Sequence, residues 1–354
     1  MHANPGVATG APAPPTSPLP PLGGGFVRAR DPSIETLRGV AVILMVLGHV
    51  IGDSFSSGLH VAEDSLYRYW YFSSSSLRMP LFTVISGFVY AMRPMQPGNL
   101  GRFLRGKARR LLVPLLVVGT AQFVLKGLIP GVNHSTNLDD LWRAHLYGFD
   151  QFWFLQALLV VFLTVAILEE FEIMAGLGGW LLCFASAVLA SRFLPKLEFF
   201  SLWGYLYLLP YFLLGCGIVR FGSRLDRFAI VALAAALVAA GLAVQQRRWF
   251  LHGNLPEDDY SWTSLAVGLG GTFLLVRFRP TIAWLAALGA YAFSIYLFHV
   301  FFTAASRIAL KRLAIDQQEI LLLVGLAFGL LGPVGAVALV QSMTGAWQRR
   351  RRLA

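Results

Sequence analysis

The sequence predicts an all-α, polytopic membrane protein, a bundle of about ten transmembrane helices with both termini in the cytoplasm. Three observations carry this prediction. Hydrophobic residues make up 56% of the 354 residues and charged residues only 13%, whereas a soluble domain usually carries about 25% charged residues. Several apolar runs approach the length of about 20 residues that a helix needs to cross a bilayer. Lysines and arginines gather in short segments between those runs, which is how membrane topology is encoded.

Both ends of the chain are expected to lie outside the helical bundle. Residues 1–27 are rich in Pro, Gly, Ala and Thr and carry no charge, which predicts a disordered tail. The basic start and continuous apolar core of a signal peptide are absent there. Residues 28–345 are expected to form the transmembrane domain, and residues 346–354 a basic cytoplasmic tail. Cys183 and Cys216 lie in apolar runs and indicate neither a metal site nor a disulfide.

The helices are expected in order along the chain. Residues 53–76 are polar and aromatic with a run of serines, and they predict a loop before the second helix. Pro114 falls in the first turn of the third helix, where its missing N–H is harmless. Trp153 opens the fourth helix, and tryptophans at several other ends indicate an aromatic belt. The ten expected segments are about 34–52, 77–92, 111–127, 153–170, 176–193, 199–219, 227–244, 261–277, 282–305 and 318–341.

The distribution of Lys and Arg sets the expected orientation. With the N-terminus in the cytoplasm, the inside segments hold more of these residues than the outside segments, as the positive-inside rule requires. The basic segment 93–110 then faces the cytoplasm, Arg38 lies near the cytoplasmic edge, and His49 lies toward the outer half of the bilayer. The same distribution explains the net charge of +11 without a nucleic-acid partner.

The first helix carries the most informative spacing, because Arg38 and His49 bracket ten residues that are apolar or glycine. Eleven helical steps of about 100° complete three turns with about 20° left over, so both side chains share one face, about 16 Å apart along the axis. An ionisable side chain at membrane depth is costly and usually marks a functional site. Since an imidazole titrates near neutral pH, His49 is the best general-base candidate. The alternative is a packing residue that bonds a neighbouring carbonyl.

Two carboxylates near these residues each have two interpretations. Glu35 lies three residues before Arg38 and can pair with it, either as part of the site or for structure alone. Asp53 lies one turn after His49 and can orient its ring, as carboxylates do for catalytic histidines. The alternative is that Asp53 is a solvated loop residue.

The basic segment 93–110 includes Arg105, Lys107, Arg109 and Arg110. Positive-inside topology and anionic lipids are sufficient to explain such a segment. The alternative is a site for a phosphate-bearing ligand from the cytoplasm, because cations at a helix start suit phosphates by charge and by the helix dipole. Composition alone favours the first explanation.

Further polar residues lie within or beside the apolar runs. Arg78 adds a cation at the expected outer start of the second helix. His299 is a second imidazole in an apolar run, with Tyr296 beside it at helical spacing, and it is either a packing residue or a substrate contact. His134 and His145 lie in a polar loop and are expected at the surface.

Together these motifs resemble the acyltransferase 3 family of integral membrane O-acyltransferases, which modify bacterial cell-surface and secreted glycans. The resemblance spans most of residues 31–341, and its most specific motif is the spacing of Arg38 and His49. Where the family usually has Arg and Asp, this sequence has Lys107 and Glu35. The supporting motifs are Arg78-Met79-Pro80-Leu81-Phe82 with Ser86-Gly87, Arg109-Arg110-Leu111-Leu112-Val113-Pro114, Trp153-Phe154-Leu155 and Ser294-Ile295-Tyr296-Leu297-Phe298-His299.

The resemblance implies an enzyme of the bacterial inner membrane that uses acyl-CoA, most commonly acetyl-CoA, and no metal. The acceptor it implies is a hydroxyl of a cell-surface or lipid-linked glycan. His49 would be the general base, with Arg38 and Glu35 completing the catalytic set and Arg78 or Tyr296 as oxyanion donor. The implied contacts to the CoA phosphates are Lys107, Arg109, Arg110 and Arg105, and those to the acceptor are Arg78, Asp53, Trp153, Tyr296 and His299.

Three alternatives stay open at this point. A covalent acyl-histidine intermediate would use the same residues as direct transfer. A small-molecule sugar or a lipid would serve as acceptor in place of an envelope glycan. A glycan or lipid transporter would also use buried charges and many helices, although such proteins often show internal repeats, and no repeat is evident in this sequence.

Overall fold

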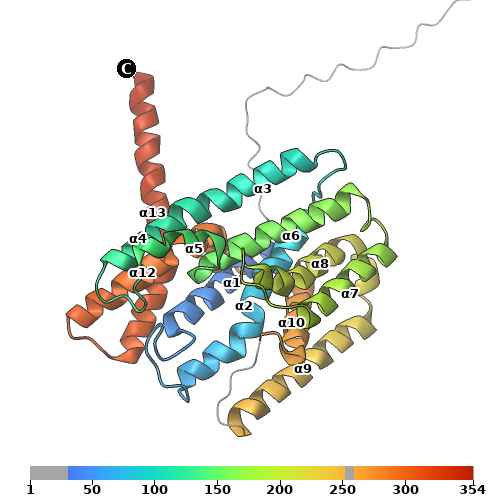
Figure 1. Cartoon of the computed structure of the whole chain (residues 1–354), viewed down its shortest axis with the longest axis horizontal. Helices are drawn as coiled ribbons and strands as arrows, with labels where there is room; N and C mark the ends of the chain where they lie inside the picture. Colours follow the sequence, from blue (N-terminus) through green and yellow to red (C-terminus); the bar gives the residue numbers. More distant parts are fainter. Residues whose placement is uncertain (1–30, 252–258, 354) are drawn as a thin grey trace, which may run out of the picture. The chain divides into compact units, whose positions relative to one another are not determined.

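The computed structural model describes residues 31–251 and 259–353, and in these ranges the chain is helical, with one isolated bridge between Tyr147 and Phe199 (Figure 1). The all-α prediction is therefore confirmed. The tail predicted over 1–27 lies outside the described residues. The helices are α1 Pro32–Ile51, α2 Leu66–Ala91, α3 Leu100–Pro114, α4 Thr120–Leu128, α5 Leu141–Leu146, α6 Trp153–Glu170, α7 Leu177–Phe193, α8 Leu202–Leu225, α9 Phe228–Leu251, α10 Trp262–Phe278, α11 Ala283–Gly289, α12 Ala292–Arg312 and α13 Gln318–Leu353.

Within the described ranges, seven helical stretches are long and apolar enough to cross a membrane, or eight if the bent pair α10 and α11 counts as one span. This confirms a multi-pass membrane protein. The apolar helix α7 is shorter. The number of about ten spans and the cytoplasmic position of both termini stay predictions.

The central element is α1, which contacts α2, α11, α12 and α13. Its start follows from local chemistry, because the Asp31 side chain accepts a hydrogen bond from the Ser33 N–H and Pro32 occupies the first turn. The helix ends at Gly52, whose positive φ of 87° suits a glycine. Partners on several sides explain why most of this helix is buried.

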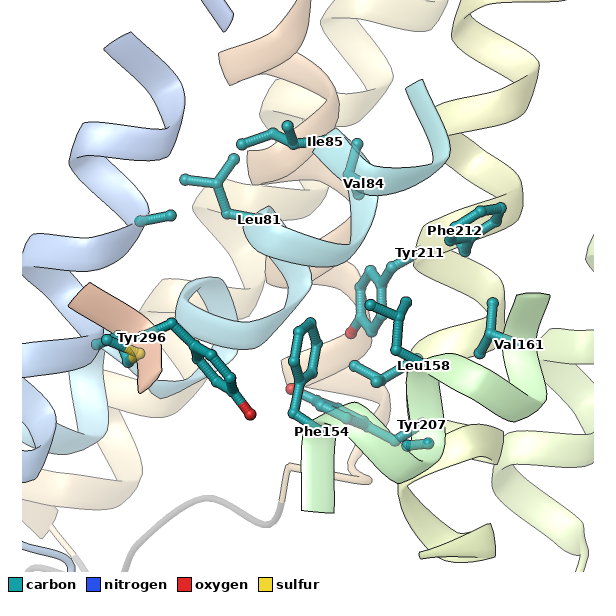
Figure 2. Close-up of a cluster of buried hydrophobic side chains, with 14 of the residues drawn as sticks. Leu81, Val84, Ile85, Phe154, Leu158, Val161, Tyr207, Tyr211, Phe212 and Tyr296 are labelled. Carbon is teal, nitrogen blue, oxygen red and sulfur yellow. The ribbon is translucent and has the colours of Figure 1, made fainter. Parts of the chain in front are cut away.

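A cluster of buried apolar and aromatic side chains joins α2, α6, α8 and α12 (Figure 2). The two best-paired helices, α2 and α8, approach each other backbone to backbone. A Cβ added at Gly87 would collide with the Phe212 carbonyl of α8, and one added at Gly215 would collide with the Val84 carbonyl of α2. Small residues at such a crossing are typical of helix packing in membranes.

The second helix is longer than predicted. Helix α2 begins at Leu66, so the predicted loop over 53–76 is wrong in its second half. The serines tolerate helix because their hydroxyls bond backwards: those of Ser74 and Ser75 donate to the carbonyls of Tyr71 and Phe72. As a result, Arg78 lies in the middle of α2 and not at its outer start.

Two further predicted boundaries are wrong. Helix α3 begins at Leu100, so most of the basic segment 93–110 is helical, and Pro114 lies inside a continuous rod instead of near its start. Proline has no N–H for the carbonyl one turn earlier, and a π-helical turn over Leu115–Gly119 follows it. The helix predicted over 282–305 is divided into α11 and α12.

Candidate functional site

A cavity of about 540 Å³ opens at the C-terminal end of α1. Its walls come from α1, α2, α4, α6, α8 and α12, from the turn before α6 and from the loops around Gly58, Asn133 and Tyr260. The cavity combines aromatic side chains with an unusually large number of charged ones, so it offers a ligand both apolar surface and polar groups. The charged lining residues are Asp53, Arg78, Lys126, Asp150, Asp259 and Arg307, and the aromatic ones include Tyr71, Trp153, Trp203, Tyr207 and Tyr260.

His49 faces this cavity from the last turn of α1. From Ser33 to Ile51 it is the one residue with an exposed side chain, and its neighbours Gly48 and Val50 are buried. The exposure arises because His49 lines the cavity, although it stands in a helix that is otherwise packed in protein. An accessible imidazole in such a place is available for proton transfer.

Arg38 shares the helix face of His49 but not this cavity. Its guanidinium lies 2.7 Å from a carboxylate oxygen of Glu35, so the predicted pair forms. The Glu35 side chain is only 6% exposed, against 32% for Arg38. Met45, which lies on the same face between the two ends, lines the cavity and is buried, whereas Arg38 is not among the lining residues.

Arg78 lies next to His49 in the cavity wall. Its guanidinium carbon is 4.0 Å from the centroid of the Tyr71 ring, which indicates a cation–π contact. Gly48 makes room for it, since a Cβ at position 48 would meet the Arg78 guanidinium. The arrangement places a fixed cation beside the imidazole of the neighbouring residue.

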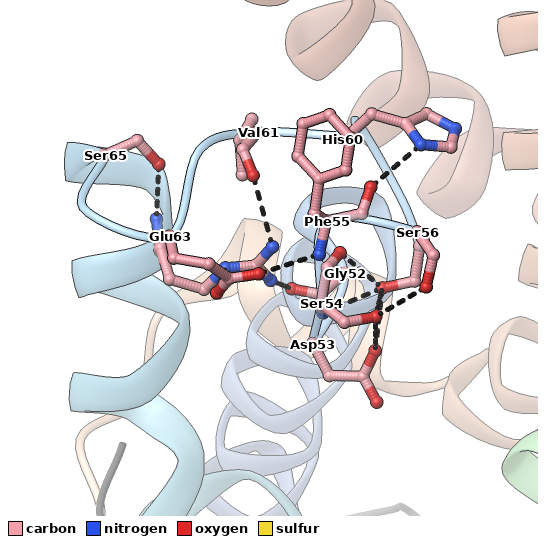
Figure 3. A network of polar contacts seen from close by, with 11 residues as sticks. Gly52, Asp53, Ser54, Phe55, Ser56, His60, Val61, Glu63 and Ser65 are labelled. Atoms are coloured by element: carbon pink, nitrogen blue, oxygen red, sulfur yellow. Dashed lines mark hydrogen bonds and ion pairs between the residues drawn. The ribbon is translucent and has the colours of Figure 1, made fainter. Parts of the chain in front are cut away.

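Asp53 also lines the cavity, but its hydrogen bonds go to serines (Figure 3). The Ser57 hydroxyl donates to Asp53 Oδ1 at 2.7 Å and that of Ser54 at 3.3 Å. Burial acts to raise the pKa of Asp53, but these hydrogen bonds and the charge of Arg68 outweigh it and hold the pKa below its ordinary value. Asp53 is thus an ionised part of the cavity wall, and the predicted bond that would orient His49 is not among its contacts.

Trp153 is the remaining predicted residue in the lining, and it packs against Trp203 with ring centroids 4.6 Å apart. Both tryptophans also line an adjoining cavity of about 510 Å³. Sequence reasoning missed Lys126 and Asp150, which form an ion pair of 2.9 Å in the wall of the first cavity. Asp150 has a φ of 40°, an unusual conformation for a residue other than glycine and one that clusters at functional sites.

The structure places Tyr296 and His299 behind the wall instead of in it. The Tyr296 hydroxyl donates a hydrogen bond to the Gln151 carbonyl at 2.6 Å. Its hydrogen is therefore already used in a contact within the protein. His299 has no exposed surface, and its ring contacts that of His49 with centroids 4.9 Å apart. Neither residue is among those that line the cavity.

The basic residues of α3 fall on two faces. Lys107 lies 3.8 Å from the ring centroid of Phe162 in α6, and the Arg110 guanidinium carbon lies 5.9 Å from that of Phe293 in α12. Arg105, Arg109 and Arg110 are exposed, and Lys107 is partly buried. Of the four predicted phosphate ligands, Lys107 and Arg110 therefore contact aromatic rings of neighbouring helices. No such contact is described for Arg105 and Arg109.

An apolar groove of about 300 Å³ lies between α4 and α12 and adjoins the cavity. The groove and the cavity share Lys126, Val132, Val300 and Ala304. Within residues 31–251 and 259–353, no group of three His, Cys, Asp or Glu side chains is arranged to hold a metal ion.

Comparisons with known proteins place the chain among membrane acyltransferases. Residues 31–340 match a family model described as "Acyltransferase domain". A protein named nodulation protein NolL from Sinorhizobium fredii is 30% identical over 206 residues, which are 56% of this chain and 52% of that protein. One of the same name from Mesorhizobium japonicum is 27% identical over 193 residues, 52% of this chain and 47% of that protein. The chain thus spans about half the length of these relatives. No solved structure matches it.

Proposed function

We propose, because the chain belongs to the acyltransferase 3 family, that it is a multi-pass enzyme of the bacterial inner membrane that moves an acyl group from acyl-CoA to a sugar hydroxyl. The donor in this proposal is acetyl-CoA, and the acceptor is a cell-surface or lipid-linked glycan. The observation that carries the proposal is the exposure of His49 to a polar and aromatic cavity from a helix that is otherwise buried.

In the proposed reaction, His49 takes the proton of the acceptor hydroxyl as the hydroxyl oxygen bonds to the thioester carbonyl carbon. The carbon–sulfur bond then breaks, and the CoA sulfur leaves as a thiol with the proton that His49 returns. Arg78, the fixed cation beside Gly48, would stabilise the negative charge on the carbonyl oxygen. A covalent acyl-His49 intermediate is the alternative, and a rapid quench would detect it as labelled protein.

The acceptor side of the proposal is supported by Trp153 and Trp203, whose paired rings offer an apolar surface to a sugar ring. The charged residues of the cavity wall would bind its hydroxyls. The groove between α4 and α12 shares Lys126 and Ala304 with the cavity. A lipid-linked sugar would therefore place its sugar in the cavity and its hydrocarbon chain in the groove.

Donor-dependent thiol release by the purified protein in detergent tests this function. We expect CoA release from acetyl-CoA that increases when a lipid-linked glycan extract is added, with the acetyl group found on the glycan by mass spectrometry. A transporter would instead move labelled lipid-linked sugar across proteoliposomes without donor and would release no thiol. Acetylation of a soluble sugar but not of the glycan would identify a small-molecule acceptor.

The donor side of the proposal relies on the two basic residues that face neighbouring helices. Replacing Lys107 or Arg110 with Gln should raise the KM for acetyl-CoA about tenfold or more, because a hydrogen bond to a charged group contributes about 1.5–3 kcal/mol. Steady-state thiol release measures this, with kcat at saturating donor nearly unchanged. The control is Arg102→Gln, another exposed arginine of the same helix, for which KM should stay within about twofold. Equal KM changes in all three variants would indicate bulk attraction instead of specific contacts.

A further inference from the structure

His299 is a buried histidine beside His49, and the proposed reaction assigns it no role. It lies in α12 with an exposed fraction of 0%, and its ring contacts the ring of His49 with centroids 4.9 Å apart and planes inclined at 50°. His49 lines the cavity and His299 does not. A direct contact between His299 and a substrate is therefore not supported by its position, whereas a contact with His49 is.

Two backbone carbonyls determine the tautomer of His299. Its Nδ1 lies 2.9 Å from the carbonyl oxygen of Ile295 and 3.0 Å from that of Tyr296. A carbonyl oxygen only accepts hydrogen bonds, so Nδ1 carries the hydrogen, and the Nε2 of a neutral ring then carries a lone pair. This Nε2 is buried and has no hydrogen-bond partner within the described ranges of the chain. A buried polar atom without a partner is uncommon and requires an explanation, and a catalytic role is one of those explanations.

The charged groups around the pair come from three elements. The charges of Arg78 in α2 and of Asp53 after α1 interact electrostatically with His49. The charge of Asp150, in the turn before α6, interacts in the same way with His299. Arg78 is a donor only and cannot accept an N–H from His49. The hydrogen bonds of Asp53 and Asp150 go to the serines and to Lys126 and Gln122. Among the described contacts of His49, the one with a nitrogen that carries a free lone pair is the ring contact with His299.

We propose that His299 is a positioning residue for His49: its Nε2, which has no partner among the residues that the structure describes, accepts a hydrogen bond from an N–H of the adjacent His49 ring during the reaction. This inference rests on the proposed function. The bond selects the His49 tautomer whose other nitrogen presents its lone pair to the cavity, and it holds the ring while that nitrogen takes the acceptor proton. Asp plays this role for histidine in hydrolase triads.

A histidine suits this position better than a carboxylate for a physical reason. An ionised carboxylate without exposed surface would add an uncompensated charge to the interior, whereas a neutral imidazole offers a lone pair without that cost. Every proton in the proposed reaction is also accounted for. The proton passes from the acceptor hydroxyl to His49 and on to the CoA sulfur, and His299 keeps its Nδ1 hydrogen throughout.

The test compares two substitutions of His299 in the full-length protein. His299→Phe keeps an aromatic ring but removes both nitrogens, and we expect kcat for acetyl transfer to fall at least about tenfold while the KM for acetyl-CoA changes less than about twofold. His299→Gln keeps an acceptor and should retain most of kcat. His145→Phe changes a partly buried histidine outside the cavity lining and serves as the control. If the Phe variant does not yield folded protein, His299→Leu takes its place.

A double-variant cycle separates positioning from a structural role. If His299 acts through His49, His299→Phe should cause no further loss in a His49→Ala background, since residues that act as a unit are not additive. A wild-type kcat in His299→Phe, or losses that multiply in the double variant, would overturn the inference alone. A wild-type protein without donor-dependent thiol release would overturn the proposed function and with it this inference.

Discussion

Replacing His49 with Ala should lower kcat for acyl transfer by about 10²–10⁴-fold, which is the usual contribution of a general base. The side chain is exposed to the cavity, and its described packing contact is the ring of His299, so its loss removes few packing contacts. Substitutions at such accessible positions usually change stability by less than about 0.5 kcal/mol. The expected result is therefore a folded protein with almost no donor-dependent thiol release.

The measurement pairs thiol release with the thermal unfolding midpoint of the same preparation in detergent. His145→Ala, at a histidine outside the cavity lining, is the matched control and should keep the wild-type rate. A His49→Ala protein that releases thiol at the wild-type rate would show that His49 is not the base. A low rate together with a lowered midpoint would indicate a folding defect instead.

Replacing Arg68 with Met should destabilise the folded protein by at least about 2 kcal/mol. Arg68 is fully buried, and its guanidinium donates to the carbonyls of Gly52 and Val61 and pairs with Glu63 at 3.0 Å. Figure 3 shows this network around the end of α1. Met fills much of the same volume but leaves two buried carbonyls without donors, and each such group costs about 1–3 kcal/mol.

Chemical or thermal unfolding of the purified protein in detergent measures this loss. The control is Arg143→Met, because Arg143 is 60% exposed on its side chain and lies 3.8 Å from Asp140. An exposed pair of this kind contributes about 0–1 kcal/mol. Arg68 of α2 would, in this view, hold the end of α1 and the nearby His49 in place through its hydrogen bond to Gly52. Equal unfolding midpoints for the two variants would contradict this view.

The first helix shows how much of the site could be predicted from local sequence. The spacing of Arg38 and His49 sets a common helix face through backbone geometry alone. The pairing of Glu35 with Arg38 is also local, and the structure confirms that contact. Whether the two ends of that face open into one cavity depends on the neighbouring helices, and the cavity reaches His49 but not Arg38.

Errors in the predicted fold have a common origin. The serines before Leu77 suggested a loop, yet their hydroxyls bond to carbonyls of their own helix. Pro114 suggested a helix start, yet the chain passes it with a π turn. In both cases the helix continues through residues that local propensity places at its end.

The sequence by itself determined that this is a multi-pass helical membrane protein whose first helix carries ionisable side chains. The lengths of the apolar runs, the positions of the charges and the helical spacing are all properties of consecutive residues. The tertiary structure alone decided which distant side chains meet. It placed Lys126 against Asp150 and the ring of His299 against that of His49. Such contacts arise from helix crossings, which depend on interhelical packing and therefore on residues far apart along the chain.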